Sequence, residues 1–143
     1  MLQTIPNSSS GRNALTVAIE AARSAGELIV QRFGTPMNVM TKSRANVVTD
    51  VDVEAENLAL GLLRNEYPNF GIISEESEPV ITGSSYTWVV DPLDGTRNYA
   101  SGIPHYAVVV ALALDGEVIL GVTHDPVRRE TFTAEKGRGA FLN

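Results

Sequence analysis

The residues best suited to chemistry in this sequence are acidic side chains that follow apolar segments. The segment 88–99 reads WVVDPLDGTRNY, in which an apolar strand is expected to end at Asp91. Pro92 fixes φ for a turn, and Asp94 follows with no basic residue between it and Asp91. Two ionised carboxylates held close together repel each other, and the pKa of one rises unless a cation lies between them. Magnesium takes carboxylate oxygens, backbone carbonyls and waters. The spacing therefore predicts a divalent-cation site at Asp91 and Asp94.

The two residues after this pair suit a phosphate group. Gly95 and Thr96 are placed where a helical turn is expected to open, and free backbone amides at a helix start bind anions. The alternative is a capped turn that holds ordinary surface aspartates.

A second acidic segment lies upstream, where IISEES (72–77) repeats the pattern of an apolar strand followed by acids. Neighbouring residues of a strand face opposite sides, so at most one of Glu75 and Glu76 is a direct metal ligand on a regular backbone. The other would lie behind it or serve a further ion. The alternative for this segment is a solvated loop.

Two helices are expected to position these acids. Apolar spacing predicts a helix over 13–33, in which Gly26 marks a close packing contact. A second helix is expected from Thr49 to about residue 67, where Thr49-x-x-Asp52 resembles a capping box. Its expected buried stripe is Val51, Ala55, Leu58 and Leu62. Residues 1–12 are expected to form a flexible N-terminal tail.

The rest of the chain is typical of strands, and Asp115-Gly116 predicts a hairpin turn. The run AVVVALAL (107–114) is apolar without alternation, which predicts a strand covered on both faces. The two helices can cover only one face, so a further layer from another chain or from missing sequence is expected on the other. The expected class is α+β, with two helices packed on a mostly antiparallel sheet. The expected strands are 37–42, 71–74, 86–91, 107–114, 118–124 and 131–134.

Charge and composition narrow the class of protein. The 143 residues include 17 acidic and 11 basic side chains, a net charge of −6, and no cysteine. Ten of the acids and a single base lie between positions 50 and 94, which favours a cation as partner and argues against nucleic-acid contact. The absence of cysteine excludes a disulfide scaffold. No apolar run reaches the length of a membrane span, and no secretory signal precedes the first helix, so a cytoplasmic enzyme is expected.

The sequence resembles the inositol monophosphatase family, within the fructose-1,6-bisphosphatase-like superfamily of metal-dependent sugar phosphatases. The resemblance rests on VMTKS (39–43), TDVD (49–52), SEES (74–77), WVVDPLDGTRNY (88–99) and EKGRGAF (135–141). It implies a layered α/β/α/β/α fold of which residues 13–143 are the N-terminal, metal-binding half. It also implies Mg²⁺-dependent hydrolysis of a small phosphorylated polyol or sugar, such as inositol monophosphate, by a metal-activated water. The complete protein would be a homodimer.

The resemblance assigns the metal ligands residue by residue. Glu75, Asp91 and the backbone carbonyl of Leu93 would bind one magnesium ion, and Asp91 with Asp94 a second. Glu76 would lie beside Glu75 as an accessory acid. A complete site would hold two or three ions.

The same resemblance assigns the catalytic residues. Gly95 and Thr96 would hold the substrate phosphate through their amides, and Thr96 with Asp50 would orient the attacking water. Glu75 would act through its ion, and Lys42 would lie on a mobile loop near the metals.

One family motif is missing. The W-D-x-A-A-G motif of the second half supplies a third carboxylate and most substrate contacts, and this sequence does not contain it. A truncated chain, whose activity alone is in question, is therefore expected. The alternative is a non-catalytic metal-binding half-domain that acts by assembling with another chain.

Overall fold

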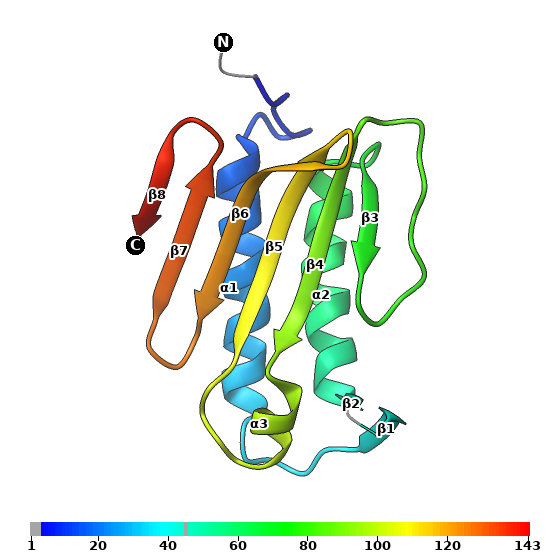
Figure 1. The fold of residues 1–143 in the computed structure, drawn as a ribbon, viewed down its shortest axis with the longest axis vertical. Coiled ribbons are helices and arrows are strands. Elements are labelled where there is room, and N and C mark those ends of the chain that lie inside the picture. The colour runs from blue at the N-terminus through cyan, green and yellow to red at the C-terminus, as the bar shows by residue number, and fades with distance from the viewer. Residues whose placement is uncertain (1–3, 45) are drawn as a thin grey trace.

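The computed structural model describes residues 4–44 and 46–143, which form an α+β fold of three helices, a six-stranded sheet and a two-stranded ribbon (Figure 1). The predicted class, two helices packed on a mostly antiparallel sheet, is confirmed. The helices are α1 (Ala14–Arg32), α2 (Asp50–Glu66) and α3 (Thr96–Ala100). The strands are β1 (Val39–Ser43), β2 (Asn46–Thr49), β3 (Gly71–Ser74), β4 (Tyr86–Asp94), β5 (Ala107–Leu114), β6 (Glu117–Asp125), β7 (Glu130–Glu135) and β8 (Gly139–Leu142).

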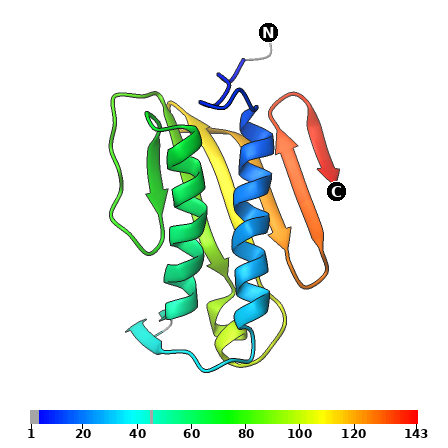
Figure 2. The ribbon, with the colours of Figure 1, turned by 180° about the vertical axis from the view of Figure 1, so that it is seen from behind.

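The large sheet has the order β3-β4-β5-β6-β7-β8, and α1 and α2 lie together across one of its faces (Figure 2). Strands β3 and β4 are parallel, and every other neighbouring pair is antiparallel. Asp115 and Gly116 both have positive φ, 49° and 84°, which is the backbone that a two-residue hairpin between β5 and β6 requires. The predicted hairpin is confirmed.

Helix α1 begins where Asn13 accepts a hydrogen bond from the Thr16 amide at 2.8 Å. Its buried face is rich in alanine, which allows the helix to lie close to the sheet. Gly26 belongs to this face, and a Cβ added there would lie 2.7 Å from Cδ2 of His124. The close packing contact expected at Gly26 is therefore confirmed.

Helix α2 begins with the predicted capping box, in which Thr49 and Asp52 satisfy each other's backbone amides. The predicted buried stripe is wrong at Leu58, whose side chain is 43% exposed. The helix is rotated so that its buried residues continue through Ala59 and Leu63.

The opposite face of the sheet is apolar and open in the described residues. In β5, alternate residues point to the helices and are buried, whereas Val109 and Ala111 point away and are half-buried. On the same face, Val89 is 36% and Phe132 is 44% exposed. The structure thus covers one face of the 107–114 strand, and the expected second layer stays a prediction.

The segment expected as a flexible tail is described from residue 4 onward, and residues 1–3 lie outside the described residues. The Ser9 amide donates to the Glu66 carbonyl at 2.8 Å, and the Ser10 hydroxyl donates to the Glu66 carboxylate at 2.6 Å. Arg12 forms an ion pair with the same carboxylate at 2.8 Å. These contacts connect the segment to the C-terminal end of α2, which the serines and glycine of its sequence did not indicate.

No helix among the described residues is long and apolar enough to cross a membrane.

Candidate metal centre

The acidic site lies where the two parallel strands end. Ser74 of β3 is paired with Val90 of β4, so Glu75 and Asp91 are the next residues on the two strands. Both side chains follow the alternation that directs Ile73 and Val89 away from the helices, toward the open face of the sheet. Carboxyl ends of parallel neighbours meet at one sheet edge, and ligand sites of α/β proteins form there.

A β-bulge brings Asp94 to the same place. Asp91 pairs with Val109 and Asp94 pairs with Ala107, so three steps along β4 match two steps along β5. Residues three apart in a regular strand face opposite sides, and the extra residue restores the same side. Asp91 and Asp94 together line a cavity of about 270 Å³. The other lining residues are Asn46, Val47, Glu75, Leu93, Gly95, Thr96, Arg97 and Asn98.

Asp91 is the most perturbed acid of this cavity. Burial, a hydrogen bond with the Glu75 carboxyl group, and the charges of Glu75 and Asp94 raise the pKa of Asp91 to about 7. Its Oδ1 atom is buried and has no hydrogen-bond partner among the described residues. A buried carboxylate oxygen without a partner, next to two more acids, is the arrangement that a cation would stabilise.

The donor set fits part of a magnesium shell. Glu75, Asp91, Asp94 and Leu93 border one cavity and supply carboxylate and carbonyl oxygens, which are the ligands that magnesium prefers. In residues 4–44 and 46–143, however, no three His, Cys, Asp or Glu side chains are grouped closely enough to hold a metal ion by themselves. The assignment of these residues as metal ligands therefore stays a prediction.

The structure separates the two adjacent glutamates. Glu76 forms an ion pair with Lys42 of β1, and its backbone amide donates to the buried Glu56 carboxylate at 2.8 Å. Burial raises the pKa of Glu76, and the bond from Lys42 opposes this rise. The same Glu56 oxygen accepts the Ser74 hydroxyl at 2.7 Å. Glu75, not Glu76, is the glutamate that lines the cavity together with Asp91.

The resemblance groups Thr96 with Asp50, but the structure places the Thr96 hydroxyl next to a different acid, Asp52. The Thr96 hydroxyl lies 2.8 Å from Oδ1 of Asp52 and 3.0 Å from the Leu93 carbonyl oxygen. Asp52 is only 1% exposed, and its other oxygen accepts the Thr49 amide at 2.9 Å. Sequence reasoning did not predict this contact of Asp52 with Thr96, although the place of Asp52 in the capping box indicated a fixed carboxylate.

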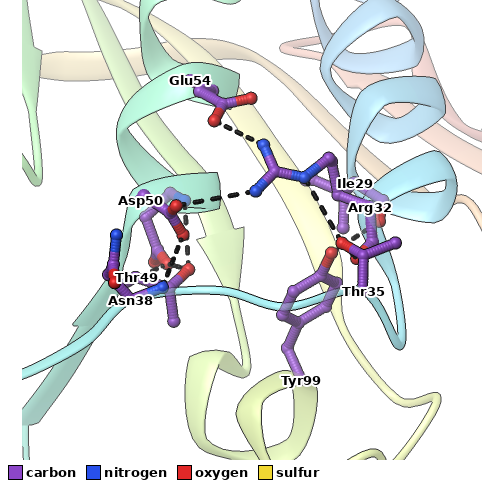
Figure 3. Close-up of polar contacts among 9 residues, drawn as sticks. Ile29, Arg32, Thr35, Asn38, Thr49, Asp50, Glu54 and Tyr99 are labelled. Atoms are coloured by element: carbon purple, nitrogen blue, oxygen red, sulfur yellow. Dashed lines mark hydrogen bonds and ion pairs between the residues drawn. The ribbon is translucent and has the colours of Figure 1, made fainter.

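Asp50 lies on the other side of the first turn of α2, because residues two apart in a helix point in nearly opposite directions. Its carboxylate is 3.5 Å from Arg32 at the end of α1 and accepts the Asn38 amide at 3.2 Å (Figure 3). Arg32 also pairs with Glu54, one turn further along α2. Asp50 therefore helps to hold α1, α2 and the segment before β1 together.

Gly95 forms the turn between the acids and Thr96. Its φ is 90°, and a Cβ there would lie 2.9 Å from the His105 carbonyl oxygen, so both the backbone and the space require glycine. This turn starts α3 at Thr96 and places both residues on the wall of the acidic cavity.

The fold and the site together define an α+β domain with an acidic cavity at the ends of two parallel strands, and the turn at Gly95 forms part of the cavity wall. A profile of the inositol monophosphatase family matches residues 11–143, so the chain belongs to that family. The resemblance inferred from the motifs is thereby confirmed.

Similar proteins carry two kinds of name. The chain is 43% identical over 132 residues to Nus factor SuhB of Salmonella typhimurium, covering 90% of this chain and 49% of that protein. It is 44% identical over 128 residues to inositol-1-monophosphatase of Caulobacter vibrioides, covering 87% and 50%. The solved structure of extragenic suppressor protein suhB from Bartonella henselae matches with a TM-score of 0.88 at 40% identity, covering 90% and 51%. The chain spans about half the length of these relatives.

Proposed function

We propose that this chain is the metal-binding half of a Mg²⁺-dependent phosphomonoesterase that acts on a small phosphorylated polyol or sugar. The observation that carries the proposal is the buried Oδ1 of Asp91, which has no hydrogen-bond partner among the described residues and belongs to a cavity that Glu75 and Asp94 also line. The names of the Caulobacter relative and of the Thermotoga maritima IMPase, a structural match with a TM-score of 0.83 at 35% identity, support this class of reaction.

Four residues would hold the metal. Glu75, Asp91 and the Leu93 carbonyl would bind one magnesium ion, and Asp91 with Asp94 would bind a second. Magnesium bound there lowers the pKa of a water molecule and neutralises negative charge on the leaving oxygen. Glu76 would remain an accessory acid, since its carboxylate is paired with Lys42.

Thr96 and Asp52 are suited to orient the attacking water. The Thr96 hydroxyl has one proton, which it can donate to Asp52, and its lone pairs are then free to accept a proton from a water in the cavity. Asp52 is held by Thr49 through two hydrogen bonds, so the acceptor is fixed before substrate arrives. This proposal gives Asp52 the role that the resemblance implied for Asp50.

The Gly95-Thr96 turn would hold the substrate phosphate. Both residues line the cavity, and Gly95 leaves no side chain between the backbone and the ligand. Lys42, on the ribbon of β1 and β2, would keep that ribbon next to the site through Glu76.

Phosphate release with and without Mg²⁺ tests the proposal. We expect Mg²⁺-dependent release of phosphate from inositol monophosphate, reduced about 100-fold or more in Asp52→Asn because the Thr96 hydroxyl loses the carboxylate that accepts its proton and no longer orients the water. Asp50→Asn is the matched control, one half-turn away on the same helix, and most of the activity should remain. Loss of activity in the control with full activity in Asp52→Asn would contradict the assignment.

A second candidate is a half-domain that acts by assembling with another chain, a homodimer partner or a different protein. The open apolar face, with Val89 and Phe132 exposed, and the name Nus factor carried by several relatives favour it. This candidate predicts that the chain binds Mg²⁺ but releases no phosphate. Light scattering of the chain would then show a dimer or a larger assembly.

A further inference from the structure

A second cavity, of about 510 Å³, lies between α1 and the turn that joins β6 to β7. It shares no lining residue with the acidic cavity. Figure 2 shows α1 running alongside β6, with β7 beyond it. The polar residues that line this cavity differ in character from the acidic site: Arg23, Glu27 and Gln31 come from α1, His124 from β6, Arg129 from the turn and Thr131 from β7.

The charge of this cavity is positive. Arg23 and Arg129 contribute two guanidinium groups, and neither forms an ion pair among the described residues, whereas Glu27 is the single acid on the wall. Nearby, Asp125 is paired with Arg128 at 4.0 Å. A cavity with an excess of positive charge stands out in a chain whose net charge is −6.

The floor of the cavity is built from buried polar side chains. Thr131 is 2% exposed and His124 is 8% exposed. The Thr131 hydroxyl accepts the Nε–H of Arg23 at 3.2 Å and lies 3.0 Å from Nδ1 of His124. Arg23 is thus held through Nε, and its terminal nitrogens make no hydrogen bond within the described part of the chain. A guanidinium fixed in this way can offer its fork of donors to a ligand.

Two backbone features shape the cavity around these groups. Arg129 has φ of 58°, a left-handed conformation that glycine or asparagine adopts more readily than arginine. Gly26 faces His124, and a Cβ at that position would lie 2.7 Å from the imidazole. Glycine therefore makes room for the histidine beneath α1.

We propose that this cavity is a second ligand site, which binds the phosphate group of a small molecule through Arg23, Arg129 and Thr131. Arginine matches the geometry of phosphate oxygens and binds them with two parallel hydrogen bonds. Glu27 opposes the binding of an anion, so it limits the affinity for highly charged ligands. The apolar side chains of Val30 and Pro126 leave part of the wall for the remainder of the molecule. This site does not depend on the proposed hydrolytic function.

Titration calorimetry with inorganic phosphate, in EDTA and on an Asp91→Asn background, tests the site without a metal ion in the acidic cavity, and the arginine variants distinguish it from phosphate binding at Gly95 and Thr96. We expect Arg23→Gln and Arg129→Gln each to weaken binding about tenfold, since each removes a charged hydrogen-bond donor. Glu27→Gln should tighten binding several-fold because it removes the opposing charge. Arg64→Gln, an exposed arginine of α2 outside the cavity, is the matched control and should leave binding unchanged.

Three results would overturn the proposal: no phosphate binding at millimolar concentration, equal weakening by Arg64→Gln, or weakening by Glu27→Gln. Circular dichroism of each variant separates a lost site from a lost fold. Because the metal site is removed in every arm, failure here leaves the proposed hydrolytic function untouched.

Discussion

Substitution of Asp91 by asparagine should stabilise the metal-free chain while abolishing its response to magnesium. The pKa of Asp91 is raised from 3.8 to about 7, first by burial and then by Glu75 and Asp94, so the folded chain disfavours the ionised carboxylate. A raised pKa contributes stability that is fully present below the unfolded value and is lost as pH rises through the folded value. The loss therefore extends from about pH 4 to pH 7.

The magnitude follows from the size of this shift. Each tenfold change in proton affinity corresponds to about 1.4 kcal/mol, so a pKa that rises from 3.8 to about 7 costs the folded state at most ~4 kcal/mol above pH 7. Asp91 is only partly buried, and screening by solvent reduces this figure to ~2 kcal/mol. The asparagine side chain carries no charge and avoids that cost at every pH.

Urea denaturation of both proteins at pH 4 and pH 8, in EDTA, measures the effect. At pH 8 we expect the free energy of unfolding of Asp91→Asn to exceed that of the unchanged chain by ~2 kcal/mol, with little difference at pH 4. Added Mg²⁺ should stabilise only the unchanged chain, because a ligand that binds the folded state raises its stability. Asp115→Asn, in an exposed turn, is the matched control. A variant equally destabilised at both pH values would refute the reasoning.

Two further substitutions test the packing. In thermal denaturation, Gly26→Ala should destabilise the chain by about 1–3 kcal/mol, because the added Cβ would lie 2.7 Å from His124. Gly61→Ala in α2, where an added Cβ would have no atom within 4 Å, should stabilise the chain by about 0.5–1 kcal/mol. Equal shifts of Tm in the two variants would contradict the close contact. Hydrogen bonds from Ser10 and its neighbours lower the pKa of Glu66 to about 2, so its contribution is present above about pH 4.5 and lost as pH falls through 2. Glu66→Gln should therefore lower stability at pH 7 and not at pH 2 in urea denaturation, and an equal loss at both would show that the charge is irrelevant.

The sequence predicts those helix starts and turns that depend on residues close together in the chain. The capping box at Thr49 and Asp52 places the start of α2, and the Asp115-Gly116 pair places the hairpin, because each depends on residues close together in the chain. The sequence does not predict strands β2 and β8, since segments of only four residues become strands only through the partner with which they pair.

The sequence predicts the acidic residues of the candidate site but not how the fold brings them together. The motifs indicated Glu75, Asp91 and Asp94, but the bulge that turns both aspartates to one side depends on pairing with β5. The choice between Asp50 and Asp52 also depends on tertiary structure, because both acids lie in one helical turn and only the position of Thr96 distinguishes them. Sequence spacing alone could not supply that contact.

The central claim is that the acids at the ends of β3 and β4 form a magnesium site. Isothermal titration of Mg²⁺ into the chain at pH 8, where the Asp91 carboxyl group has released its proton, tests it most directly. We expect binding to the unchanged chain and to Asp115→Asn, and no measurable binding to Asp91→Asn. Equal Mg²⁺ affinity in the unchanged chain and Asp91→Asn would contradict the claim.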